Sequence, residues 1–68
     1  MLQEITKVKE IIEKAEIVMD IPIAYQFASS VRNNAESIAK TIEKSNNITE
    51  KQREALNNME QALDKWIH

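Results

Sequence analysis

The sequence contains no cysteine and no glycine, and its single histidine, His68, is the last residue. Without cysteine the chain cannot form a disulfide, and without several Cys and His ligands it cannot build a typical tetrahedral zinc site. The absence of glycine excludes the Gly-rich loops that hold phosphates in nucleotide-binding enzymes. We therefore expect neither a metal nor a cofactor.

The chain has only 68 residues, which limits the hydrophobic core that it can build. A protein of this size buries only about 60% of the surface that its unfolded form exposes. Small proteins usually gain further stability from disulfides, a metal or subunit association. Because this chain lacks the residues for a disulfide or a typical zinc site, subunit association remains. The sequence therefore predicts a single helical domain, residues 1–68, that is completed by homo-oligomerisation.

Positive and negative charges are nearly balanced, with nine Lys and Arg against eleven Asp and Glu and a net charge of -2. The two signs alternate along the chain, whereas proteins that bind nucleic-acid polymers carry a basic face. No stretch approaches the ~20 apolar residues that span a bilayer, and the mean hydropathy is -0.47. We expect no nucleic-acid polymer and no membrane as a partner, and a cytoplasmic location, since an apolar leader is also missing.

Heptad spacing of apolar residues predicts a first helix at about 2–19 and a second at about 22–45. Pro22 separates them, because proline lacks an amide donor and disfavours helical geometry in the preceding residue. Its fixed φ suits the first turn of a new helix, with Asp20 or Ile21 as the cap. The heptad positions are Met1, Ile5, Val8, Ile12, Ala15 and Met19 in the first helix and Ala24, Ala28, Val31, Ala35, Ile38 and Ile42 in the second.

Ser45, Asn46 and Asn47 predict a turn, because their side chains compete for backbone hydrogen bonds and Asn tolerates left-handed geometry. Thr49 and Gln52 then have the spacing of a capping box, which indicates a third helix at about 49–67. Its heptad positions are Leu56, Met59, Leu63 and Trp66. The predicted fold is therefore an all-α bundle of three helices, and Met59 and Trp66 are expected mainly to pack in its core, with ligand stacking as the alternative.

A surplus of apolar residues lies off the heptad positions and clusters around the break at residues 20–22. Exposed apolar clusters usually mark an interface, so we expect this one to form a subunit contact. Three of the six heptad positions in the second helix are alanine, which would let a neighbouring helix approach closely. The surplus residues are Ile11, Ile17, Val18, Ile21, Ile23, Tyr25 and Phe27.

No combination of residues predicts an enzyme, because a nucleophile, a base and an orienting group cannot be assembled from these residue types. The carboxylates Glu10 and Glu13 lie three or four residues from Lys7, Lys9 and Lys14, the spacing of ordinary ion pairs on a helix surface. We interpret them as surface charges and not as an acid–base pair.

Arg32 and Arg53 are the only arginines, and a guanidinium offers a planar, bidentate donor that also stacks on nucleobases. Both can equally be solvated helix charges, as can Lys40. Tyr25 lies off the heptad positions, where its ring could pack on another subunit or on a planar base. These residues are candidates for ligand binding, with a purely structural role as the alternative.

From Arg32 onward the chain resembles a family of short phage proteins, the anti-CBASS cyclic-oligonucleotide sponges. The resemblance covers about 35 of the 68 residues. The matching residues are Arg32, Ala35, Ile38, Ala39, Ile42, Thr49, Ala55, Leu56, Met59, Glu60 and Ala62. Members of this family are all-helical, form homo-oligomers described as hexamers, and sequester cyclic di- and trinucleotides in pockets between subunits without cleaving them. The resemblance thus implies immune evasion in the cytoplasm of an infected bacterium.

The resemblance also implies site residues. Arg53 matches the family arginine of the trinucleotide pocket, and Asn57, one turn later, stands where the family commonly has threonine. Tyr25 and Arg32 are the nearest candidates for the aromatic and basic residues of the dinucleotide pocket. The competing hypothesis is a small helical inhibitor or adaptor that binds a partner protein through an apolar helix face.

Overall fold

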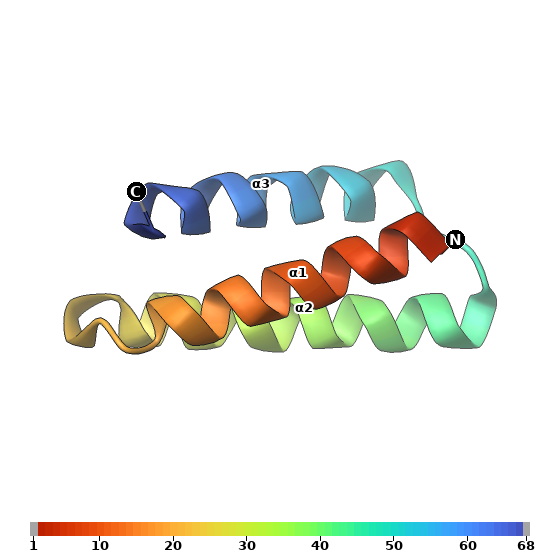
Figure 1. Ribbon diagram of the computed structural model, residues 1–68. Coiled ribbons are helices and arrows are strands. Elements are labelled where there is room, and N and C mark those ends of the chain that lie inside the picture. Colours follow the sequence, from red (N-terminus) through yellow and green to blue (C-terminus); the bar gives the residue numbers. More distant parts are fainter. Residues whose placement is uncertain (1, 68) are drawn as a thin grey trace.

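The computed structural model describes residues 2–67, and these form three α-helices with no strand: α1 (Leu2–Val18), α2 (Tyr25–Ser45) and α3 (Glu50–Ile67). A short 3-10 helix, η1 (Pro22–Ala24), precedes α2. α1 lies between the other two helices and packs against both, whereas α2 and α3 contact each other little. Figure 1 shows that α2 runs antiparallel to α1 and that α3 runs in the same direction as α1. The predicted all-α, three-helix bundle is confirmed.

The break between the first two helices lies where proline predicts it. Ile21 has extended geometry, with φ -91° and ψ 111°, and serves as the cap of η1, whose first residue is Pro22. The predicted helix at 22–45 differs in one respect, because residues 22–24 form a 3-10 turn and α2 begins at Tyr25. The amides of Asp20 and Ile21 bond back to Ile17 and Val18, at 3.2 and 2.9 Å, which tightens the joint.

The turn between α2 and α3 also follows the local sequence. Asn46 has left-handed geometry, with φ 54°, and its amide donates to the Ile42 carbonyl at 2.7 Å. The Thr49 amide donates to Gln52 Oε1 at 3.0 Å, and the Gln52 amide donates to Thr49 Oγ1 at 3.1 Å. This reciprocal pair is the predicted capping box. As the cap, Thr49 lies just outside the helix, which begins at Glu50.

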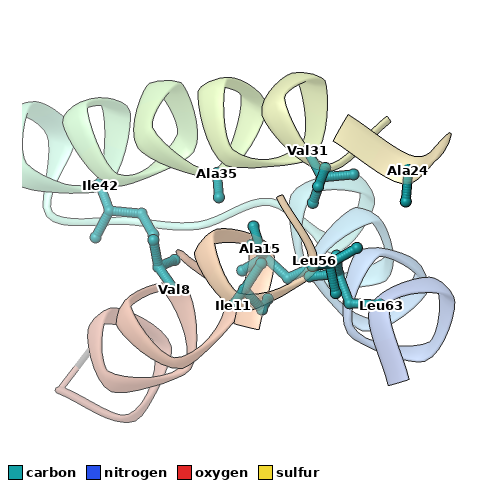
Figure 2. Close-up of a cluster of buried hydrophobic side chains, with 11 residues drawn as sticks. Val8, Ile11, Ala15, Ala24, Val31, Ala35, Ile42, Leu56 and Leu63 are labelled. Carbon is teal, nitrogen blue, oxygen red and sulfur yellow. The ribbon is translucent and has the colours of Figure 1, made fainter. Parts of the chain in front are cut away.

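The core is a single cluster of aliphatic side chains from all three helices. On α2 the heptad prediction is nearly complete, since only Ile38 is partly rather than fully buried. The small alanines allow α1 to pack closely, and Figure 2 shows Ala35 above Ala15 and Ile42 reaching toward Val8. The buried residues are Val8, Ile11, Ala15, Val18, Ala24, Ala28, Val31, Ala35, Ile42, Leu56 and Leu63.

Two of the residues expected at a subunit contact belong to this core instead. Ile11 and Val18 are completely buried within the chain, and Ile21 packs against the core from its edge. The predicted heptad positions Ile5, Ile12 and Met19 are only partly buried. The reason is that α1 contacts two helices, so its covered stripe is wider than one heptad line and is shifted from it. Met1, the first predicted position, lies outside the described residues.

Trp66 is likewise not a core residue, because 42% of its surface is exposed. α3 packs mainly on α1, so only a narrow stripe through Leu56 and Leu63 is fully covered. Met59 lies beside this stripe and is partly buried. Trp66, one heptad later at the end of the helix, keeps an exposed face.

Candidate functional site: a polar groove and an apolar end

Polar side chains join α1 to α3 along one side of their interface. Lys14 Nζ lies 3.0 Å from Asp64 Oδ1 and donates to Glu60 Oε2 at 3.2 Å. Lys7 donates to the Asn57 side-chain oxygen. In each of these pairs the residue of α3 comes about fifty positions after the residue of α1. This nearly constant separation is what two parallel helices produce.

A groove lies between α1 and α3 where both helices begin. Its volume is about 530 Å³, and Gln3, Glu4 and Lys7 of α1 line it together with Arg53 and Asn57 of α3. A second hollow of about 420 Å³ continues it and shares Gln3 and Lys7. The groove thus brings together Arg53 and Asn57, two of the four predicted site residues, and adds Lys7.

The groove lies at the positive ends of two helix dipoles, because α1 and α3 both begin there. Glu4 and Glu50 in the first turns complement this polarity. Arg53 Nη2 lies 3.1 Å from Glu4 Oε1, and its Nη1 lies 3.9 Å from Glu50 Oε1. A hydrogen bond from its own backbone amide, together with the nearby Arg53, holds the pKa of Glu4 below its usual value. Glu4 is therefore ionised at neutral pH, and an anionic ligand must compete with it for Arg53.

Carboxylates outnumber cations along the groove and its continuation. Glu4, Glu10 and Glu60 line them, against Lys7 and Arg53. Lys7 is also 3.8 Å from Glu60 Oε1. The electrostatic potential of the single chain therefore offers a phosphate a local attraction at Arg53 and not a broadly basic surface.

The other two predicted site residues lie on α2. Tyr25 is half exposed at its start, and Arg32, two turns later, has its Nε 3.5 Å from Glu36 Oε1. That Nε is buried and has no well-formed hydrogen bond to the described residues. Figure 1 shows that α2 and α3 begin at opposite ends of the bundle. Tyr25 and Arg53 therefore do not meet within one chain.

The end of the bundle away from the groove carries exposed apolar side chains from every helix. Ile23 in η1 is 84% exposed, and Ile17 near the end of α1 is 59% exposed. Tyr25 and Phe27 follow at the start of α2, and Trp66 and Ile67 come from the end of α3, which Figure 1 places at this same end. We call this set, Ile17, Ile23, Tyr25, Phe27, Trp66 and Ile67, the apolar end. Four of its members belong to the predicted subunit contact, and Trp66 and Ile67 were missed because helix packing, not local sequence, brings them there.

Within residues 2–67, no three His, Cys, Asp or Glu side chains lie where they could hold a metal ion together. None of the helices in this part of the chain is long and apolar enough to cross a membrane.

Comparison with protein-family models, curated proteins and solved structures finds no match to this chain.

Proposed function

We propose that the protein is a non-catalytic interaction module that docks onto another polypeptide through the apolar end. The observation that carries this proposal is that the segments of α1, η1, α2 and α3 at one end of the bundle all carry large exposed apolar residues. Soluble proteins seldom expose such clusters unless a partner covers them. The partner is either a second copy of the chain or a different protein.

Substitution of Ile23 provides the test, because this side chain is 84% exposed and can change without loss of the fold. Ile23→Glu should leave the helical circular dichroism unchanged and abolish association. If the partner is a second copy, sedimentation equilibrium of the wild type gives a multiple of 7.9 kDa, the mass of one chain, and the variant gives that mass. A monomeric wild type that also binds no amphipathic peptide would contradict the proposal.

A second function is favoured by the groove, and it is compatible with the first because the two surfaces lie at opposite ends. The proposed ligand is a cyclic di- or trinucleotide, which the chain sequesters without cleaving it. Arg53, Lys7 and Asn57 line one groove at two helix N-termini, where anions are favoured. The resemblance to the cyclic-oligonucleotide sponges supplies the ligand class.

Calorimetry with cyclic trinucleotides tests this function. A charge-assisted hydrogen bond to phosphate contributes ~1.5–3 kcal/mol, so Arg53→Ala should weaken binding about ten- to a hundredfold. Lys51→Ala is the matched control, since Lys51 is an exposed cation in the same helical turn. If the wild type binds no cyclic di- or trinucleotide, this second function is wrong.

Glu4→Gln gives a sharper version of the same test. Because Glu4 is the nearer of the two carboxylates beside Arg53, at 3.1 Å against 3.9 Å for Glu50, removal of its charge should weaken the competition for the guanidinium and tighten ligand binding severalfold. A purely structural Arg53–Glu4 pair predicts no gain in affinity.

A further inference from the structure

Negative charges outnumber positive ones around the apolar end, and this excess bears on the chemistry of its partner. Glu13 lies four residues before Ile17 and so on the same side of α1, Glu16 lies next to Ile17, and Asp20 follows in the turn after α1 ends at Val18. All three carboxylates are exposed. Lys14 lies close to Ile17 in the sequence and Asp64 lies close to Trp66, but these two charges pair with each other at 3.0 Å. Among the described residues within one helical turn of the apolar end, the remaining cation is Lys65.

We infer that the apolar end binds a cationic amphipathic helix of a partner protein, one that presents large apolar side chains flanked by lysine or arginine. This inference rests on the proposed docking function and adds the chemistry of the partner. The apolar side chains provide the buried contact, and the carboxylates of Glu13, Glu16 and Asp20 attract the flanking cations and set the orientation.

The same excess of negative charge disfavours the other occupants of this surface. An anionic lipid surface would meet the three carboxylates with charge of the same sign. A second copy would present the same three carboxylates and one cation, Lys65, so it matches the charge of this surface less well than a cationic helix does. A cationic amphipathic helix can cover the apolar residues and also pair its cations with these carboxylates.

Trp66 supplies the measurement, because it is the only tryptophan of the chain and belongs to the apolar end. Two synthetic helical peptides without tryptophan share one apolar face and differ in their polar face, lysine in one and glutamate in the other. The lysine peptide should bind and shift the Trp66 emission to shorter wavelength, and raised ionic strength should weaken this binding. The glutamate peptide should bind at least about tenfold more weakly, a difference of ~1.4 kcal/mol.

Two variants separate the apolar and the electrostatic contributions. Ile23→Glu should abolish binding of the lysine peptide, and the double variant Glu16→Lys, Asp20→Lys should weaken it about tenfold. The control is Glu54→Lys, a charge reversal of an exposed carboxylate on α3 near the groove, which should leave the affinity unchanged.

Several outcomes would overturn the inference. Equal affinity for the two peptides would show that charge does not select the partner, although docking itself would stand. A wild-type oligomer that Ile23→Glu dissociates would make a second copy the occupant, and the proposed function would again survive. Tighter binding to anionic vesicles than to the lysine peptide would refute both the partner class and the charge argument.

Discussion

Thr49 and Gln52 form the clearest local interaction in the chain, since each side chain accepts a hydrogen bond from the other residue's amide. Thr49→Ala leaves the Gln52 amide without its partner and should lower the free energy of unfolding by ~1 kcal/mol. Urea denaturation measures this change. Thr49→Ser keeps the hydroxyl and should retain most of the stability. An equal loss in both variants would show that the Thr49 hydroxyl does not stabilise the start of α3.

Ala35 tests close packing at the scale of one side chain. It is completely buried, and Figure 2 places it above Ala15 of the facing helix. Ala35→Leu should force α1 and α2 apart and cost about 1–3 kcal/mol of stability. Asn34→Leu is the control, because residue 34 is exposed on the same helix. A stable Ala35→Leu variant with an unchanged midpoint would mean that the interface has room for a larger side chain.

Features that depend on single residues and their neighbours were predicted well from the sequence. Pro22, Asn46 and Thr49 each fix backbone geometry through their own chemistry, so the break, the left-handed turn and the cap all lie where they were expected. Trp66 was placed wrongly because its burial depends on how far α1 covers α3, which no local pattern reports.

At the scale of the elements, α3 is held mainly by α1, through Leu56, Leu63 and the polar pairs beside them. Leu63→Ala should therefore destabilise the bundle by about 2–5 kcal/mol, from lost apolar contact and a remaining cavity. Thermal or urea unfolding followed by circular dichroism gives the value. Trp66→Ala, at an exposed site on the same helix, should cost clearly less, and the reverse order would contradict the assigned burial.

Because Lys14 forms ion pairs with α3, the attachment of α3 should weaken at alkaline pH. Hydrogen bonds first to Asp64 and then to Glu60 raise the pKa of Lys14 above 10.5. Because the pKa is higher in the folded state, the stabilisation is fully present below about pH 10.5 and is lost as the pH rises through the folded value. Lys14→Met should remove this part of the alkaline loss, measured as stability against pH, whereas the exposed Lys9→Met should not.

The alignment of α1 with α3 could not be predicted from the sequence. Heptad spacing shows which face of a helix is apolar, but residues about fifty positions apart meet only after the turns have set the helix directions. Lys7 and Lys14 were interpreted through neighbours on their own helix, yet they also pair with Asn57, Glu60 and Asp64 of α3. The candidate groove was accordingly predicted only in its α3 residues, Arg53 and Asn57.

At the scale of the whole molecule, the bundle measures 35 × 17 × 17 Å and separates its two candidate surfaces along its length. The polar groove lies where α1 and α3 begin, and the apolar end lies where they finish. A cation in the groove and an apolar contact at the far end can thus be altered independently. Arg53→Ala should leave peptide binding unchanged, and Ile23→Glu should leave the Arg53 groove intact, as paired titrations with nucleotide and peptide would show.

The parallel course of α1 and α3 decides where a fusion partner can be attached without interference. In Figure 1 the first described helix starts at the groove and the last one finishes at the apolar end. A bulky domain joined after the C-terminus should therefore obstruct peptide docking while sparing the groove. The same domain joined before the N-terminus should crowd the groove and leave docking free. A bulky fusion at either terminus should consequently obstruct a different candidate surface, and protein without a fusion is the reference for both.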